Sequence, residues 1–538
     1  MPTLNWIGKE AVVNHHRHVP FHLLKDVPDL ACGKPGDGNL IVQGDNLVAL
    51  KALLPYYAGQ VKCIYIDPPY NTGNEGWVYN DNVNSPVIRE WLGRTVGKEG
   101  ETLDRHDRWL CMMYPRLALL RQFLCEDGAI FISIDDNESP NLIQICDEIF
   151  GIQNRVLQGV WIKRVSPAND AKYFSSDHEF IVIYAKHKDL WRPQKLTRTE
   201  KQLENYRNPD NDPRGPWNSV TYTCNKSADE RPNLYHGITN PNTGKVIWPK
   251  KTAVWKYDAA RHRENELSGL VWWGAGGTAR MPRLKRFLHE MGDVVPRSFF
   301  HYDDTGHTQE ARSELLEVLP DCPFTTPKTS RLIRRIIELA TNPGDLVLDS
   351  FAGSGTTGHA VLSLNHLALN EGPRRFILVE MEKKIASEVT AERVRRVTEG
   401  YTNAKGERVE GLGGGFRYCE LGEPLFDENG KIRETVGFAD LARHVYFSET
   451  GEPLPRERVN KSPFLGACRG VGIYLLYNGI LGDQSANGGN VLTRAVLAQL
   501  PPFDGQKVIY CAGCLLGRDR LQAERIIIRQ TPYEIKVS

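Results

Sequence analysis

The chain has 538 residues, of which 41% are hydrophobic and 25% charged, and its formal net charge is +1. This length exceeds what one hydrophobic core serves, so about three or four domains are expected. No apolar run reaches the length of a membrane span and no basic-then-apolar signal opens the chain, which predicts a cytoplasmic protein. The 11 cysteines are odd in number and scattered, which indicates free thiols.

Two strand signals come first along the chain, and an acidic residue follows each. Residues 40–43 form an apolar run that turns at Gly44-Asp45 into a helical pattern. Because Asp favours the N-cap of a helix, this role is one expectation for Asp45. Residues 61–66 form the second strand, and the tetrapeptide 67–70 follows it directly. The chemistry of this tetrapeptide makes it the first candidate for a functional site.

The tetrapeptide Asp67-Pro68-Pro69-Tyr70 combines a carboxylate, a rigid backbone and an aromatic ring. Asp67 and the Pro68 carbonyl can each accept a hydrogen bond from an exocyclic NH2 group, and proline aims that carbonyl in advance. Tyr70 offers a ring face for stacking. Together these groups favour a site that grips a planar ring and makes its amine nucleophilic. A Pro-Pro turn with a chance aromatic is the alternative interpretation.

A strand at 129–134 ends in Asp135 and Asp136, which are interpreted chiefly as core, and a basic segment follows. Residues 151–300 contain 25 Lys and Arg against 15 Asp and Glu, a net of +10 beside −9 for the rest of the chain. They also carry seven of the 11 tryptophans. Basic residues interleaved with aromatics suit contact with nucleic acid, although core aromatics and a solvated charged face would explain the same composition.

A strand, a glycine-rich turn and a helical pattern recur downstream. Residues 346–351 read as a buried strand, and Gly353 and Gly355 lie in the turn after it. Such a turn lets the backbone approach a nucleotide cofactor, and the helix N-terminus offers free N–H groups. The pattern is Phe-x-Gly-x-Gly rather than the full dinucleotide fingerprint. A further strand, 375–379, ends in Glu380, at a spacing from the glycines where an acidic residue holds ribose hydroxyls.

With these motifs the chain resembles the amino-methyltransferases of DNA, which use S-adenosylmethionine. Their catalytic motif is similar to Asp67-Pro68-Pro69-Tyr70, and their cofactor motif is similar to Phe351-Ala352-Gly353-Ser354-Gly355. The catalytic motif comes first here, an order that resembles the circularly permuted beta group. Within that group the chain resembles most the modification subunits of type III restriction systems and related site-specific adenine methyltransferases.

The resemblance implies a doubly wound, Rossmann-like α/β methyltransferase core into which the basic segment is inserted as a target recognition domain. The expected boundaries are 1–150 for the catalytic half of the core, 151–323 for the insert, 324–420 for the cofactor half and 421–538 for a small C-terminal α/β domain. Nothing in the last domain resembles a catalytic motif. Dimer formation, DNA clamping and docking of a partner subunit all stay open for it.

The resemblance also implies roles for residues. Asp67, Pro68, Pro69 and Tyr70 are expected to hold and activate the target amine, and no metal is expected. The residues expected at the cofactor are Asp45, Thr326, Lys328, Asp349, Phe351, Gly353, Gly355, Thr356 and Glu380. For Asp45 the N-cap and the cofactor contact are weighed equally. At Pro327-Lys328 the usual Lys-Pro order of the family is reversed, which leaves the contact of Lys328 open.

The expected activity is methyl transfer from S-adenosylmethionine to the 6-amino group of adenine in double-stranded DNA, with the base flipped out of the helix. A restriction or related defence system is the expected setting. A helicase–nuclease restriction subunit and a second copy of the chain are the candidate protein partners. Three alternatives stay open: a cytosine 4-amino methyltransferase, a methyltransferase for RNA or protein amines, and a non-catalytic DNA-recognition subunit. In place of Asp67, the first usually has Ser and the second would favour Asn.

Overall fold

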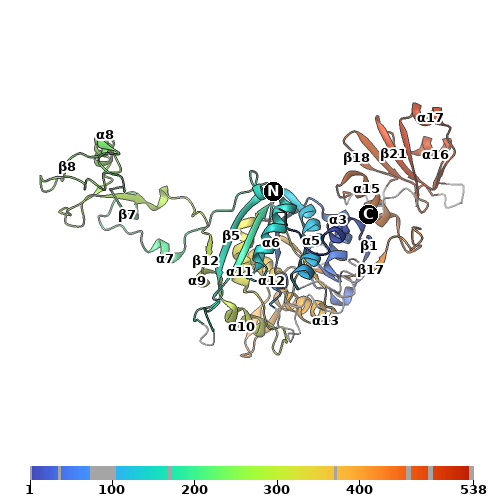
Figure 1. The fold of residues 1–538 in the computed structure, drawn as a ribbon, viewed down its shortest axis with the longest axis horizontal. Coiled ribbons are helices and arrows are strands. Elements are labelled where there is room, and N and C mark those ends of the chain that lie inside the picture. The colour runs from blue at the N-terminus through green and yellow to red at the C-terminus, as the bar shows by residue number, and fades with distance from the viewer. Residues whose placement is uncertain are drawn as a thin grey trace. The chain divides into compact units, whose positions relative to one another are not determined.

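The computed structural model describes residues 3–33, 38–72, 105–167, 172–368, 372–455, 462–482 and 489–531. The chain forms two compact units (Figure 1). The first consists of Met1–Gln194 and Arg297–Ser538, and the second of Lys195–Pro296. They are called the main unit and the inserted unit below.

A ten-stranded sheet forms the centre of the main unit (Figure 1). In order across the sheet, its strands are β1 (His22–Asp26), β17 (Arg417–Pro424), β2 (Leu40–Gln43), β14 (Arg375–Glu380), β13 (Leu346–Asp349), β3 (Val61–Ile66), β4 (Leu124–Ile134), β6 (His178–Ala185), β5 (Arg155–Ile162) and β12 (Phe299–Phe300). The six strands from β17 to β4 are parallel, whereas β1 and β6 run antiparallel to their neighbours. The inner strands are unbroken apolar runs, as expected when helices cover both faces of a parallel sheet.

Helices do cover both faces. Those used below are α3 (Asn46–Tyr57), α5 (Arg105–Phe123), α10 (Thr308–Val318), α11 (Ser330–Ala340), α12 (Thr356–Leu367) and α14 (Glu392–Glu399). Residues of α3 and α5 share one hydrophobic cluster with Val379 of β14. On the helix α12, a Cβ at Gly358 would lie 3.1 Å from Cδ1 of Leu378, the residue that precedes Val379 on β14. Successive strand residues point to opposite faces, so α12 packs on the other side, and the predicted doubly wound α/β fold is confirmed.

The range predicted as an insert, 151–323, encloses more than the inserted unit. Strands β5, β6 and β12 lie within that range but extend the central sheet, since β6 pairs with β4 from Ala129 to Ile134. The charge along the sequence, which indicated the insert, does not reveal which strands pair with the central sheet. The compact unit of 195–296 keeps 17 Lys and Arg against 11 Asp and Glu, a net of +6.

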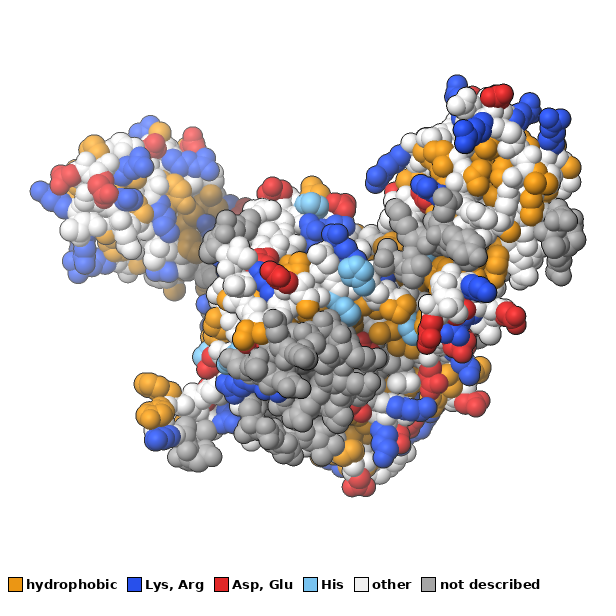
Figure 2. All heavy atoms as spheres, turned by 45° about the vertical axis from the view of Figure 1, so that its right-hand side comes forward, with side chains coloured by type: hydrophobic (Ala, Val, Ile, Leu, Met, Phe, Trp, Pro, Cys, Tyr) orange, Lys and Arg blue, Asp and Glu red, His pale blue; other side chains and the backbone are white. Residues whose placement is uncertain are grey.

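The inserted unit is small and built from short strands. Its elements are α7 (Glu200–Leu203), β7 (Trp217–Thr221), β8 (Ile238–Thr239), β9 (Val246–Ile247), α8 (Ala259–Leu267), β10 (Val271–Trp272) and β11 (Arg283–Phe287). Lys, Arg, Asp and Glu side chains are interspersed on the visible face of the lobe that carries α7 and α8 (Figure 2). Trp217, Trp255 and Trp273 are buried in it, whereas Trp248 is 54% exposed. Burial of these three tryptophans favours the alternative interpretation, in which the aromatic residues form a core.

The C-terminal part of the main unit carries a second sheet. It consists of β18 (Phe464–Cys468), β19 (Val471–Leu475), β21 (Gln506–Cys511) and β23 (Ile526–Gln530), in that order, with the last three parallel. Helices α15 (Phe438–Thr450), α16 (Arg494–Gln499) and α17 (Arg518–Ala523) accompany it. This part therefore has α/β structure, but it belongs to the main unit and does not form a compact unit of its own.

Candidate functional site

The two predicted motifs follow neighbouring strands of the central sheet. Asp67 comes directly after β3, and the glycine loop comes directly after β13. The strands pair in parallel, with Val347 opposite Cys63, so their carboxyl ends meet at one edge. A cavity of about 550 Å³ opens there, a size typical of cofactor sites. Except for Asp45 and Gly355, the predicted site residues all line it: Asp67, Pro68, Pro69, Tyr70, Thr326, Lys328, Asp349, Phe351, Gly353, Thr356 and Glu380.

Hydrogen bonds hold the Asp-Pro-Pro-Tyr segment from both sides. The indole N–H of Trp109 on α5 donates to the Pro69 carbonyl at 2.7 Å. Asn71 adopts a left-handed φ of 56° and its amide donates to the Arg105 carbonyl at 3.0 Å, so strain after Tyr70 is stabilised by a side-chain bond. In the part of the chain that the structure describes, no donor bonds the Pro68 carbonyl. That oxygen remains available to a ligand.

A charged network surrounds the Asp67 carboxylate. Tyr70 donates its hydroxyl to Oδ1 at 2.8 Å, and Lys328 donates Nζ to Oδ2 at 2.6 Å. Glu179 of β6 approaches from the other side, with Oε2 2.9 Å from the Tyr70 hydroxyl and Oε1 3.2 Å from Nζ of Lys163. Lys328, predicted among the cofactor residues with its contact left open, therefore contacts the Asp-Pro-Pro-Tyr segment through Asp67.

Burial dominates the titration of this network. It raises the pKa of Asp67 above its ordinary value despite the nearby Lys328. It also raises the pKa of Tyr70 well above the usual range, and the Asp67 carboxylate adds to that rise. Burial would do the same for Glu179, but the ammonium groups of Lys328 and Lys163 outweigh it and the pKa is lowered. The Tyr70 hydroxyl thus stays protonated, as a donor, and Glu179 stays ionised.

Glu179 and Lys163 are not among the site residues predicted from the sequence. Glu179, with a side chain 8% exposed, is the second residue of β6 and directly precedes the hydrophobic run 180–185. Lys163 follows β5 directly. A carboxylate within an apolar strand needs a partner when buried, and that pattern is the signal that could have singled out Glu179.

The glycine loop adopts the conformation that its residues permit. Gly353 and Gly355 have φ angles of 50° and 75°, in the left-handed region that favours glycine. A Cβ on Gly353 would lie 3.0 Å from the ring of Phe324, which also lines the cavity. Arg393 of α14, fully buried, donates to the hydroxyl groups of Ser354 and Thr356 at 3.1 and 2.8 Å. Arg393 of α14 therefore holds the loop in place, and Gly353 of the loop lines the cavity.

Two buried carboxylates lie beside this loop. Glu380 accepts hydrogen bonds from the backbone N–H groups of Gly353 and Glu382, both at 2.9 Å. Asp349 accepts from the backbone of Phe351 at 3.0 Å and the hydroxyl of Thr357 at 2.5 Å. Burial raises the pKa of each to about 7. Buried carboxylates beside a cavity whose pKa is raised in this way are candidates for ligand contacts.

Asp45 has a structural partner set. Its Oδ1 accepts from the backbone N–H groups of Leu47 and Val48 at 2.9 and 3.2 Å, which makes it the N-cap of α3. Its Oδ2 pairs with Arg116 at 3.0 Å. Of the two roles weighed for Asp45, the structure thus displays the N-cap, while the neighbouring Asn46 and Arg116 line the cavity.

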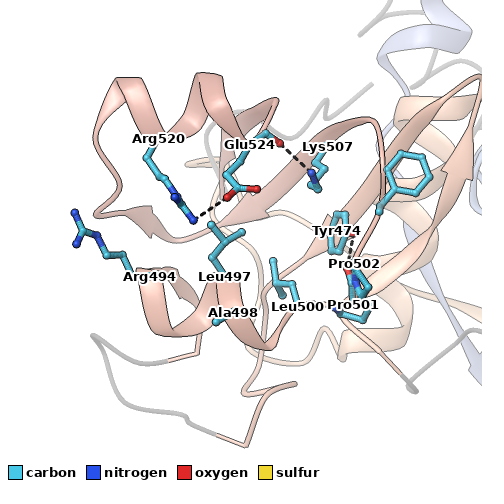
Figure 3. A pocket seen from close by; sticks show the side chains of 11 residues that line it. Tyr474, Arg494, Leu497, Ala498, Leu500, Pro501, Pro502, Lys507, Arg520 and Glu524 are labelled. Carbon is cyan, nitrogen blue, oxygen red and sulfur yellow. Dashed lines mark hydrogen bonds and ion pairs between the residues drawn. The ribbon is translucent and has the colours of Figure 1, made fainter.

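A second cavity, of about 670 Å³, lies in the C-terminal part. Figure 3 shows it between α16 and α17, with Arg520 pointing toward Glu524 and Lys507 donating to the Glu524 carbonyl at 2.9 Å. Tyr474 donates its hydroxyl to the Pro501 carbonyl at 2.7 Å. None of the predicted site residues lines this cavity.

Other features of the described residues bear on the class of protein. No helix in the described ranges is long and apolar enough to cross a membrane. Within the same ranges, no three His, Cys, Asp or Glu side chains come together in a way that could hold a metal ion. The 11 cysteines are all free thiols.

Comparison with known proteins agrees with the geometry. The family model described as DNA methylase, N6_N4_Mtase, matches residues 61–392. The Mod subunit of the type III restriction-modification enzyme StyLTI from Salmonella typhimurium is 35% identical over 366 residues, 66% of this chain and 54% of that protein. The EcoPI Mod subunit from Escherichia phage P1 is 31% identical over 427 residues, 71% of this chain and 64% of that protein.

The DNA adenine methyltransferase YhdJ of Escherichia coli is 21% identical over 382 residues, 69% of this chain and 92% of that protein. The chain thus spans between half and two thirds of the length of the two Mod subunits and nearly all of YhdJ. The family match covers more than half of the chain and includes both strand-end motifs. The chain therefore belongs to the DNA methylase family.

Proposed function

We propose that the chain transfers a methyl group from S-adenosylmethionine to the 6-amino group of adenine in double-stranded DNA, as part of a restriction-modification system. The observation that carries this proposal is the shared cavity, where the Asp67 segment and the glycine loop follow paired strands. One side of that cavity suits an amine and the other suits a nucleoside cofactor. The name of the relative YhdJ supports adenine as the base.

The residues on the cofactor side fit S-adenosylmethionine. At Gly353 the loop presents backbone without a side chain to the cavity, and Glu380 offers a carboxylate for ribose hydroxyls. Phe351 and Phe324 supply apolar surface beside the loop. When bound, S-adenosylmethionine supplies the methyl group that is transferred.

The residues on the base side fit an exocyclic amine. Asp67 and the Pro68 carbonyl both accept hydrogen bonds, and an amine has two N–H groups to donate. Tyr70 stacks on the base with its ring. These contacts orient the nitrogen lone pair toward the methyl group, and such positioning supplies most of the acceleration. Because the 6-amino group is paired and stacked in duplex DNA, the base has to be flipped out first.

The inserted unit is the proposed DNA-recognition part, since it carries a net charge of +6 and contacts to phosphates need Lys and Arg. A restriction subunit is the proposed protein partner, because the Mod relatives are named as subunits of type III enzymes. The free thiols are consistent with the bacterial cytoplasm as the compartment.

Sequencing the DNA of a host that expresses this chain, with detection of modified bases, tests the proposal. We expect N6-methyladenine at one short sequence motif, and no modification in a host that expresses Asp67→Ala. N4-methylcytosine at a motif would instead support the cytosine alternative. Unmodified DNA from both hosts, with the chain present and folded, would contradict a catalytic function.

A further inference from the structure

The place that the proposed function assigns to the adenine amine is taken by Lys328 in this structure. Its Nζ lies 2.6 Å from Asp67 Oδ2 and 4.9 Å from the centre of the Tyr70 ring. The first contact uses an oxygen that would accept from the amine, and the second places the ammonium group over the ring that would stack on the base. An ammonium group and an exocyclic amine are both N–H donors, so they compete for the same acceptor.

A second acceptor for Lys328 lies within reach. Glu179 Oε2 is 3.6 Å from Lys328 Nζ, so a small movement of the side chain exchanges one carboxylate for the other. The charge of Lys328, a side chain only 10% exposed, would remain paired after this movement. This matters because an unpaired buried charge is strongly destabilising, whereas an exchange between two carboxylates is not.

The surroundings hold Glu179 ready for that role. Lys163 donates to its Oε1 at 3.2 Å, a contact that does not depend on Lys328. The Tyr70 hydroxyl lies 2.9 Å from Glu179 Oε2 and 2.8 Å from Asp67 Oδ1, and its single proton goes to one of these oxygens at a time. The backbone carbonyl of Lys328 accepts from the Thr356 hydroxyl at 3.3 Å. Thr356 begins α12 directly after the glycine loop, so the position of Lys328 is also linked to the cofactor side.

From these contacts we propose that Lys328 is a positioning residue: it holds Asp67 while the site is empty and moves to Glu179 when the flipped adenine arrives. The inference rests on the proposed function and extends it to two residues. Lys328 keeps the catalytic carboxylate oriented before the base enters. Glu179 receives the ammonium group and thereby frees Asp67 for the amine.

The proposal predicts an unusual sign for a pair of substitutions. Glu179→Gln removes the negative charge that would draw Lys328 away from Asp67, so Lys328 stays on Asp67 and single-turnover methylation should slow by about 100-fold. Adding Lys328→Met removes the competing ammonium group, so the double variant should be faster than Glu179→Gln alone. Adding Lys163→Met is the matched control, because Lys163 also pairs with Glu179 but does not touch Asp67. It should give no recovery. The proposal would be overturned if Lys328→Met and Lys163→Met each restored the rate of Glu179→Gln, or if neither did.

A second measurement decides the point if Glu179→Gln does not fold. Lys328→Met alone should bind its target duplex about tenfold more tightly, because the place of the amine is vacant. The probe is a fluorescent duplex that carries the recognition motif with its target adenine unmethylated, and S-adenosylhomocysteine is present. A duplex with 2-aminopurine at the target, which lacks the 6-amino group, should show no gain. Weaker binding of the adenine duplex would contradict the proposal. Failure of the wild-type chain to methylate adenine would contradict the proposed function itself.

Discussion

Glu380 is predicted to destabilise the ligand-free protein as the pH rises. Its carboxylate is 5% exposed, and burial raises its pKa from 4.5 to about 7. Between these values the folded state binds a proton that the unfolded state does not, so this contribution to stability is complete below pH 4.5 and is lost as the pH rises through 7. A rise of roughly 2.5 units at 1.36 kcal/mol per unit gives a loss of about 3 kcal/mol by pH 8.

Glu380→Gln removes this titration. The glutamine has one acceptor oxygen for the two N–H groups that Glu380 now accepts, from Gly353 and Glu382, so the variant loses about 1–3 kcal/mol at every pH. That offset is constant and leaves the pH dependence to report on the carboxylate. Asp349 still contributes in the same direction, since its pKa is also raised to about 7 by burial, so the variant should keep a smaller slope.

Hydrogen–deuterium exchange of β14, normalised to the intrinsic exchange rate at each pH, measures the local free energy of opening. Between pH 5 and pH 8 the wild-type chain should lose about 2.5 kcal/mol more than Glu380→Gln. A change that is the same in both proteins would refute the assignment of the raised pKa to Glu380. Because the proposed function places Glu380 at the ribose hydroxyls of S-adenosylmethionine, Glu380→Gln should also weaken binding of that cofactor, as calorimetry can measure.

Three further predictions concern the base, the cofactor and DNA. Asp67→Ala should bind S-adenosylmethionine with modest loss yet methylate more slowly by several orders of magnitude, because its contact to the amine strengthens in the transition state; near-normal turnover would contradict this. Gly353→Val should abolish cofactor binding in calorimetry, since its Cβ would crowd Phe324 at 3.0 Å on a backbone with φ of 50°; unchanged affinity would count against the loop. In salt titrations of DNA binding, Lys245→Gln and Lys250→Gln, at exposed positions of the inserted unit, should each reduce the log–log slope of affinity against salt by about one unit. Arg494→Glu and Arg520→Glu in the C-terminal part should not reduce it. The reverse pattern would place DNA recognition elsewhere.

The sequence alone was sufficient for features that depend on local chemistry. Asp67-Pro68-Pro69-Tyr70 and the Gly353 turn are recognisable because a strand end, a proline pair and a glycine with positive φ are each encoded within a few residues. Their meeting was also predictable, since parallel strands in a doubly wound sheet end at the same edge. The N-cap at Asp45 follows the same local logic.

The tertiary structure decided what depends on contacts between distant segments. Glu179 and Lys163 reach the Asp67 carboxylate because β6 and β5 extend the central sheet beyond β4, a pairing that no local pattern announces. The same pairing reduces the inserted unit to 195–296. Lys328, 261 residues from Asp67, forms an ion pair with it. The physical reason is that local propensity sets where strands begin and end, whereas the order of strands in the sheet sets which side chains share a buried space.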